Sequence, residues 1–137
     1  MAAPRFDIPN PDFETQPFWD AAREHRLLIQ RCDECGRHQF YPRPFCAKCW
    51  SADIAWVEAS GRARLYSYSI VHQNDLPPFP ERVPYVAAVV DLDEGPRMLS
   101  NVVDCPHDEI DVGMALEVEY RELNDDITIP VFHRAGA

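Results

Sequence analysis

The fold is decided by residues 32–49, which read CDECGRHQFYPRPFCAKC. The segment contains two Cys-x-x-Cys pairs, Cys32 with Cys35 and Cys46 with Cys49, separated by ten residues. Two such pairs on one short hairpin place four thiolates around a single ion, so we predict a four-cysteine site that holds structural zinc. Gly36 is expected to supply the positive φ that the first turn needs. Iron is the alternative metal, because a rubredoxin-type site uses the same four ligands.

The overall composition is that of a globular chain rather than a membrane protein. The 137 residues correspond to one domain, or to one domain with a small satellite. Hydrophobic residues make up 46% and charged residues 26% of the chain. The sequence lacks the run of about 20 apolar residues that a transmembrane helix needs. The first 30 residues also lack a signal-peptide core, so we expect a cytoplasmic protein with no membrane association.

The charge is distributed unevenly along the chain. Residues 1–50 carry seven basic and seven acidic side chains, whereas residues 51–137 carry six basic and sixteen acidic ones. The whole net charge of −10 therefore lies in the second segment. A field of this sign repels phosphate backbones, so nucleic-acid binding by residues 51–137 is disfavoured.

The first 30 residues are predicted to form an extended arm followed by one short helix. Residues 1–14 have no hydrophobic period. Thr15 and Pro17 suit the cap and first-turn positions of a helix that is expected to end near Arg26. The apolar face of this helix is predicted to contain Phe18, Ala21, Ala22 and His25.

The remaining sequence predicts short strands. Two of them, at residues 27–30 and 39–41, flank the first cysteine pair. After Cys49 the pattern becomes alternating, and strands are expected at residues 54–58, 64–72, 85–92, 97–103, 116–121 and 127–131. Four prolines make residues 74–84 a loop. The predicted fold class is therefore mainly β with a short N-terminal α-helical segment: an arm and helix at 1–30, a rubredoxin-like zinc ribbon at 31–52 and a five-stranded OB-fold barrel at 53–137.

The order of motifs resembles that of a known family. The matching residues are Phe18-Trp19, Leu28 to Cys32, Cys35-Gly36, Pro42-Arg43-Pro44, Cys46, Cys49, Trp56, Gly61, Tyr66-Ser67-Tyr68, Pro84-Tyr85-Val86, Leu92 to Arg97, Gly113-Met114, Pro130 and Phe132. Together they resemble the acyl-CoA-associated zinc-ribbon/OB-fold proteins, formerly a domain of unknown function. The resemblance extends from about residue 15 to residue 134.

This resemblance implies a non-catalytic accessory subunit in a hetero-oligomer. Members look like partners of thiolases, thiolase-like aldolases, hydroxymethylglutaryl-CoA synthases and hydratases that act on acyl-CoA. In actinobacteria such pairs often serve steroid side-chain degradation, and fatty-acid side chains are a related substrate class. The helix and ribbon are expected to bind the partner, and the barrel to lie near the path of CoA.

The alternatives to an accessory subunit are an enzyme that acts alone and a nucleic-acid-binding protein. An enzyme acting alone is disfavoured, because the five histidines have no nucleophile motif beside them and the sequence has no phosphate-binding loop. Zinc ribbons and OB-folds also occur together in nucleic-acid-binding proteins, where tyrosines stack on bases. Here Tyr66, Tyr68 and Tyr85 are expected to fill the barrel instead. Cys105, flanked by acidic residues, is interpreted as an unreactive thiol.

Specific contacts with CoA and with the partner are also predicted. Arg31, Arg37 and Arg43 lie in the nearly neutral ribbon segment, and their guanidinium groups suit the phosphates of acyl-CoA. Phe18 and Trp19 are adjacent on the helix and therefore point about 100° apart. Both cannot face the ribbon, so one of them is expected to anchor the partner subunit. The alternative is that both rings are covered by the chain's own arm, residues 1–14.

Overall fold

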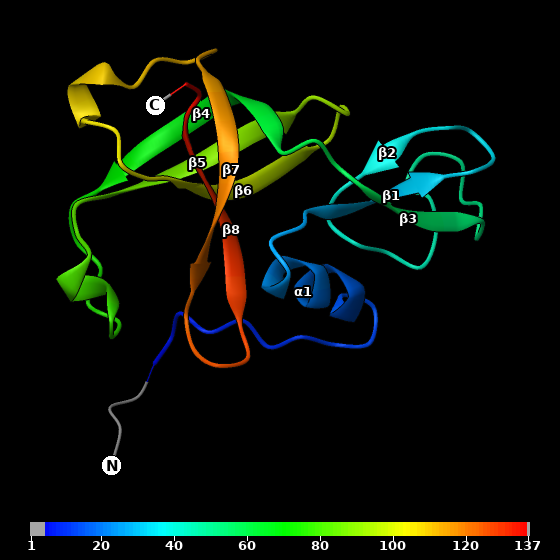
Figure 1. Cartoon of the computed structure of the whole chain (residues 1–137), viewed down its shortest axis with the longest axis horizontal. Helices are drawn as coiled ribbons and strands as arrows, with labels where there is room; N and C mark the ends of the chain where they lie inside the picture. Colours follow the sequence, from blue (N-terminus) through cyan, green and yellow to red (C-terminus); the bar gives the residue numbers. More distant parts are fainter. Residues whose placement is uncertain (1–4, 137) are drawn as a thin grey trace.

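A three-stranded sheet, a five-stranded barrel and one helix make up the chain (Figure 1). The structure is a computed structural model, and it describes residues 5–136. The sheet contains β1 (Leu28–Cys32), β2 (His38–Gln39) and β3 (Ile54–Glu58), and the barrel contains β4 (Arg62–Val71), β5 (Tyr85–Leu92), β6 (Arg97–Val102), β7 (Ala115–Glu122) and β8 (Thr128–Arg134). The predicted fold class is confirmed.

Helix α1 (Gln16–Arg23) packs against both β1 and β8, between the sheet and the barrel (Figure 1). Its buried residues are Phe18, Ala21 and Ala22, as predicted. The helix is shorter than expected, because His25 has a φ of 59° and leaves the helical path. The predicted place of His25 on the apolar face is therefore wrong. Its ring instead stacks on Tyr120 of β7, with ring centroids 5.0 Å apart.

β1 is the central strand of the small sheet, and β2 and β3 pair with it in antiparallel fashion. β3 has the predicted limits, but it lies in the segment that was expected to belong to the barrel. Three residues after it, Gly61 has a φ of +83° at the entry to β4. A Cβ at this position would lie 2.5 Å from Val118 Cγ1, so the close approach of β7 requires glycine here.

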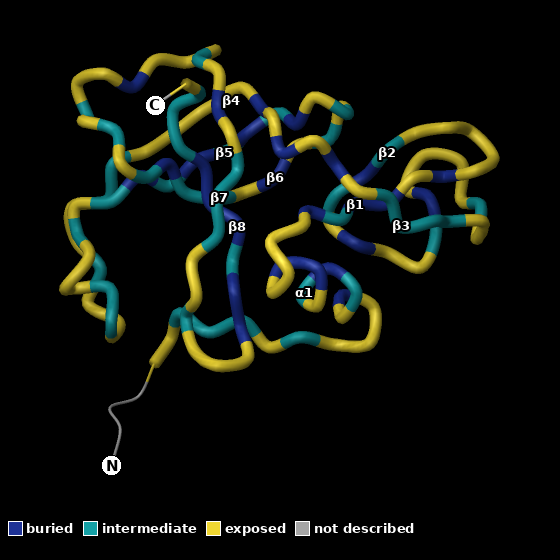
Figure 2. The backbone as a smooth tube through the Cα atoms, viewed as in Figure 1, coloured by how far each residue is buried: buried dark blue, intermediate teal, exposed yellow. Residues whose placement is uncertain are grey.

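The barrel closes in the order β4-β5-β6-β8-β7. Alternate residues of β5 are buried, and its limits agree with the prediction. Two of the joins are short: β4 pairs with β7 over residues 62–64 only, and β6 pairs with β8 at the single rung Val102–Phe132. Phe132 is fully buried at this rung. The barrel core is continuous with Phe18 of α1 and Ile29 of β1, so the sheet and the barrel share one core (Figure 2).

The predicted role of Tyr66 and Tyr68 inside the barrel is wrong. A β-bulge shifts the β4–β5 register between Leu65 and Ser67, and among residues 5–136 β7 pairs with β4 only before this bulge, at residues 62–64. Tyr66 and Tyr68 are consequently 46% and 36% exposed, and Tyr85 is half-buried. Within residues 5–136, no helix has both the length and the hydrophobicity to cross a membrane.

Candidate functional site

The four cysteines come together at the far end of the small sheet. Cys32 ends β1, Cys35 lies in the turn that follows, and Cys46 and Cys49 lie in a second turn. Their sulfur atoms are all within 4.8 Å of one another, with 3.5 Å between Cys32 and Cys49 and 3.7 Å between Cys35 and Cys46. A tetrahedral zinc ion about 2.3 Å from each sulfur needs sulfur–sulfur distances of about 3.8 Å. The donor set therefore fits a four-thiolate structural metal.

Backbone N–H groups point at these sulfurs, as is usual for thiolate ligands. The N–H of Cys35 donates to Cys32 Sγ at 3.4 Å, and those of Lys48 and Cys49 donate to Cys46 Sγ at 3.4 and 3.5 Å. The Cys49 and Lys48 N–H groups lower the pKa of Cys46 to about 6. Gly36 has the expected positive φ, +79°, and its N–H donates to the Cys32 carbonyl. The pKa of Cys49 shifts the other way: the Ser51 N–H lowers it, but burial and the sulfur of Cys32 raise it to about 12, so the N–H donors favour the charged form at Cys46.

Two buried glutamines, which the sequence analysis did not single out, shape the loop between the cysteine pairs. Gln30 and Gln39 lie opposite each other on β1 and β2. Gln30 Oε1 accepts the Arg43 N–H, and Gln39 Oε1 accepts the Ala47 N–H. The sequence does contain an indication of this role, because Gln30 and Gln39 are polar residues on the two predicted strands that flank the first cysteine pair.

The three predicted phosphate-binding arginines are not brought together. Arg37 and Arg43 line one cleft between the ribbon and the β5–β6 turn, and Arg97 joins them there. Within residues 5–136, neither the Arg37 nor the Arg43 side chain has an ion pair or a hydrogen bond. Arg31 does not line this cleft, and its guanidinium is paired with Asp33 at 2.9 Å. Two of the three predicted residues therefore share a cleft, which has a volume of about 820 Å³.

The two predicted anchors differ in exposure. Phe18 is only 3% exposed and belongs to the core, so its predicted role at the partner surface does not fit the folded chain. Trp19 is half-buried and packs edge-on against Phe18, with ring centroids 4.9 Å apart. It lines a groove of about 680 Å³ that we call the apolar groove. Its apolar lining residues include Trp19, Phe40, Tyr41, Leu99, Ile129 and Pro130. Leu99 is 77% exposed.

Family comparison assigns both parts of this architecture. Residues 19–55 match the family described as "ChsH2, rubredoxin-like zinc ribbon domain", and residues 56–121 match "ChsH2, C-terminal OB-fold domain". Among solved structures, the chain resembles one described as "Ltp2-ChsH2(DUF35) aldolase", with 37% identity and a TM-score of 0.85. That match covers 93% of this chain and 99% of the other.

Two curated relatives extend the comparison. The chain is 40% identical over 119 residues to a probable enoyl-CoA hydratase alpha subunit of Thermomonospora curvata, covering 86% of this chain but 37% of the relative. It is 34% identical to a DUF35 domain-containing scaffold protein of Methanocaldococcus jannaschii, covering 79% of this chain and 77% of that protein. The chain therefore spans little more than a third of the hydratase alpha subunit that it matches.

Proposed function

Because the chain belongs to the ChsH2 (DUF35) family of zinc-ribbon and OB-fold proteins, we propose that it is a non-catalytic accessory subunit of an acyl-CoA enzyme. The partner is a thiolase-like, aldolase or hydratase subunit, and the two form a hetero-oligomer. The observation that carries this proposal is the likeness, at 37% identity, to almost the whole of a chain described within an aldolase. The site of action that we propose is the cytoplasm, in the degradation of steroid or fatty-acid side chains.

The apolar groove is the surface that we propose for the partner. Trp19, Tyr41 and Leu99 expose apolar surface at the seam between α1, the ribbon and β6. Exposed apolar surface of this kind usually marks a protein interface. Aromatic side chains also contribute a large share of binding energy at such interfaces, so Trp19 is the proposed anchor.

We further propose that Arg37 and Arg43 contact the phosphates of acyl-CoA bound at the partner. Both guanidinium groups are without partners among the described residues, although eight of the other arginines form ion pairs. Unpaired guanidinium groups in one cleft suit phosphate oxygens. The metal in the four-cysteine site is proposed to be zinc, with a structural role only.

The test is copurification with the acyl-CoA enzyme encoded beside this chain. We expect a stable complex, and we expect Leu99→Asp to weaken it at least tenfold in a surface-binding assay. Val112→Asp is the matched control, because Val112 is 66% exposed and lies outside the groove. Failure to form a complex, or equal effects of the two variants, would contradict the proposed docking surface.

The role in catalysis is tested on the same complex. Arg37→Gln with Arg43→Gln should raise the KM for acyl-CoA about tenfold, whereas Arg23→Gln on α1 should leave it unchanged. The isolated chain should not turn over acyl-CoA thioesters by hydrolysis, hydration or carbon–carbon cleavage. Turnover by the chain alone would overturn the proposed accessory role.

A nucleic-acid-binding function is the second candidate. It gains one argument from the structure, since Tyr66 and Tyr68 are exposed rather than inside the barrel. However, the guanidinium of Arg97 lies 3.6 Å from the centre of the Tyr66 ring and covers a face that a base would use. Titration with single-stranded oligonucleotides at increasing salt separates the two candidates, because phosphate contacts weaken strongly with salt.

A further inference from the structure

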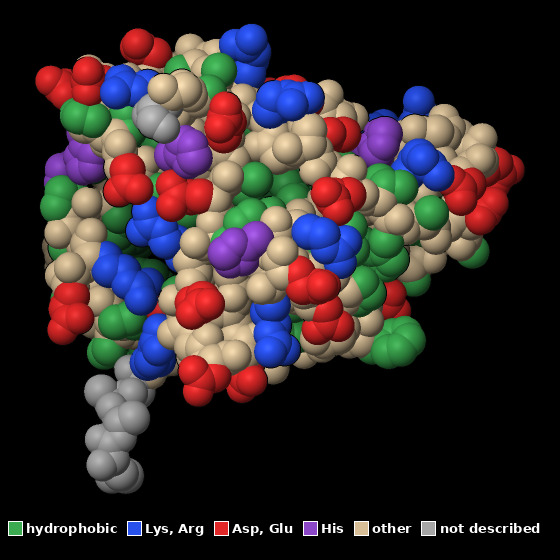
Figure 3. Space-filling view, in the orientation of Figure 1, with side chains coloured by type: hydrophobic (Ala, Val, Ile, Leu, Met, Phe, Trp, Pro, Cys, Tyr) green, Lys and Arg blue, Asp and Glu red, His purple; other side chains and the backbone are tan. Residues whose placement is uncertain are grey.

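A cavity of about 550 Å³ lies at one end of the barrel, away from the metal site, and it shares only Asn101 and Ile129 with the lining of the apolar groove. It is bounded by the proline-rich loop, the end of β6 and the β7–β8 turn, and Figure 3 shows it as a hollow with hydrophobic atoms at its floor and basic side chains at its edge. We call it the barrel-end cavity. Its apolar lining residues include Phe79, Val86, Val103, Ile129 and Val131, and its basic ones are Arg82, Arg121 and His107.

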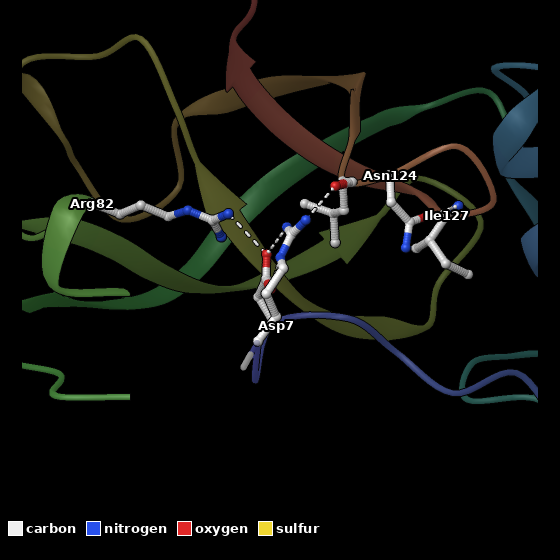
Figure 4. Close-up of polar contacts among 6 residues, drawn as sticks. Asp7, Arg82, Asn124 and Ile127 are labelled. Carbon is white, nitrogen blue, oxygen red and sulfur yellow. Dashed lines mark hydrogen bonds and ion pairs between the residues drawn. The ribbon is translucent and has the colours of Figure 1, made fainter. Parts of the chain in front are cut away.

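Arg82 is held in place by a carboxylate from the N-terminal arm (Figure 4). Its Nη2 donates to Asp7 Oδ2 at 2.8 Å, and the Asp7 side chain is only 2% exposed. Arg5 donates two hydrogen bonds to the same carboxylate, from Nη2 at 2.8 Å and from Nε at 3.0 Å. A charge-assisted hydrogen bond that a guanidinium donates to a buried carboxylate fixes the orientation of the guanidinium. Arg82 is therefore oriented before any ligand arrives.

The arm also ties the two loops at the mouth of the cavity to each other. Arg5 Nη1 donates to the Leu123 carbonyl at 2.9 Å, at the start of the β7–β8 turn. The Phe6 N–H donates to the Pro77 carbonyl at 2.9 Å, in the proline-rich loop. Within the β7–β8 turn, Asn124 Oδ1 accepts a hydrogen bond from the Ile127 N–H at 2.7 Å, and this bond stabilises the conformation of the turn (Figure 4). The walls of the cavity are thus joined through residues 5–7.

The second guanidinium is fixed in a similar way. Arg121 donates to Asp104 at 2.8 Å and to Glu119 at 3.1 Å. A guanidinium has five N–H donors. Among the described residues Arg82 uses one of them and Arg121 two, so both retain donors for a ligand. Asp104 and Glu122 also line the cavity, and Asp7 and Glu119 pair with the two guanidinium groups, so the described residues give the cavity no excess of positive charge. A polyphosphate is therefore disfavoured, and the free guanidinium N–H groups are left to bind a single carboxylate.

We propose that the barrel-end cavity binds a small organic carboxylate with an apolar body. The carboxylate accepts hydrogen bonds from Arg82 and Arg121, and the apolar body lies against Val86, Ile129 and Val131. The cavity volume is within the range of about 300–1,000 Å³ that is usual for small-molecule sites. Asp7 is a positioning residue for Arg82. This inference goes beyond the proposed function, because it involves none of the residues of the Arg37–Arg43 cleft and needs no partner subunit.

The experiment is an NMR titration of the full chain with three probes that share an eight-carbon body: octanoate, 1-octanol and octylammonium. We expect octanoate to shift the amide signals of Val86, Val103 and Val131 in a saturable way, and to bind at least tenfold more tightly than 1-octanol. Octylammonium should not bind. Equal affinities for octanoate and 1-octanol, or shifts confined to Trp19 and Leu99, would overturn the proposal.

Variants test the two guanidinium groups and the positioning residue. Arg82→Gln and Arg121→Gln should each weaken octanoate binding about tenfold, and Arg23→Gln is the matched control that should not. Asp7→Asn should weaken octanoate while leaving 1-octanol unchanged, an effect that general loosening of the fold would not produce. The Arg82 and Arg121 side chains are exposed whereas that of Asp7 is 2% exposed, and thermal melting verifies that each variant is folded. Unchanged octanoate affinity in both arginine variants would overturn the proposal.

Discussion

The Gln39 side-chain amide donates to Gln30 Oε1 at 2.8 Å across one rung of the β1–β2 pair. Both side chains are almost fully buried, at 9% and 3% exposure. Gln39 Nε2 also donates to the Phe45 carbonyl at 3.1 Å, and its Oε1 accepts the Ala47 N–H at 3.0 Å. Phe45 and Ala47 are the neighbours of Cys46. This pair of amides therefore holds the second cysteine turn in register with the first.

Gln39→Leu should weaken the metal site without touching a ligand. The substitution removes the side-chain partner of the Ala47 N–H and of the Phe45 carbonyl, and each hydrogen bond lost costs about 0.5–1.5 kcal/mol. We expect faster zinc release to a chelator and a lower melting temperature. Gln16→Leu is the control, because the Gln16 amide only bonds Asp20 at the surface of α1. Equal release rates in the two variants would show that the glutamine pair does not support the site.

Removal of one ligand should unfold the ribbon. Metal analysis is expected to give about one zinc per chain, and Cys46→Ser should abolish stable binding, because ligation supplies about 10–16 kcal/mol in small zinc modules. The matched control is Cys105→Ser, since Cys105 lies outside the site. A folded, metal-free protein with a disulfide between Cys32 and Cys35 would contradict this prediction, and an iron content near one would favour the alternative metal.

Gly61→Ala should destabilise the barrel. The new Cβ would lie 2.5 Å from Val118 Cγ1, and the φ of +83° is itself unfavourable for alanine. Overpacking of this kind costs about 1–3 kcal/mol, measured as a change in the free energy of unfolding. Gly113→Ala separates the two causes, because Gly113 has a φ of +90° but no atom within 4 Å of its Cβ position. If Gly61→Ala and Gly113→Ala lower the free energy of unfolding equally, the contact with Val118 does not destabilise the barrel.

The neighbouring aromatic residues of α1 should respond differently to truncation. Phe18→Ala removes a core ring and should cost about 3–5 kcal/mol of folding stability. Trp19→Ala should cost less in a melting experiment, because this ring is half-buried at the groove wall. It should nevertheless weaken the complex with the partner at least tenfold. Loss of folding in Trp19→Ala, with normal affinity in the fraction that remains folded, would make Trp19 a core residue.

The N-terminal arm should detach at low pH. The Arg5 hydrogen bonds, followed by those from Arg82, hold the pKa of Asp7 below its usual value. A carboxyl whose pKa is lowered by folding stabilises the native state above its ordinary pKa, near 3.8, and this contribution is lost as the pH falls through the lowered value. The amide signal of Phe6 reports the contact. It should be unchanged from pH 7 down to about pH 4, whereas Asp7→Asn should alter it already at pH 7.

Local features were predictable from the sequence, and contacts between distant segments were not. The cysteine spacing specified the four-thiolate site, and the apolar run from Tyr85 to Leu92 specified a central strand, because both depend on neighbouring residues only. The pairing of Asp7 with Arg82 joins positions 75 residues apart and has no periodic signal. The bulge after Leu65 interrupts the alternation of β4: among the described residues Tyr66 has no rung partner, and Tyr68 lies opposite the buried Ala88 but is 36% exposed, because β7 pairs with β4 only at residues 62–64. Arg31 does not line the cleft of Arg37 and Arg43 and is paired with Asp33, two positions away, which a count of net charge does not show.

The short joins of the barrel have a consequence for its motions. β4, β5 and β6 form one antiparallel meander and β7 and β8 one hairpin. Among the described residues the strands of the two units pair only over residues 62–64 and at the Val102–Phe132 rung, and a few backbone hydrogen bonds, such as that from the Leu65 N–H to the Met114 carbonyl, flank these joins. Regions with few shared backbone hydrogen bonds open at lower free energy than the elements that they connect. Amide hydrogens at these two joins should therefore exchange with solvent sooner than those inside the meander, because the barrel opens first between the meander and the hairpin.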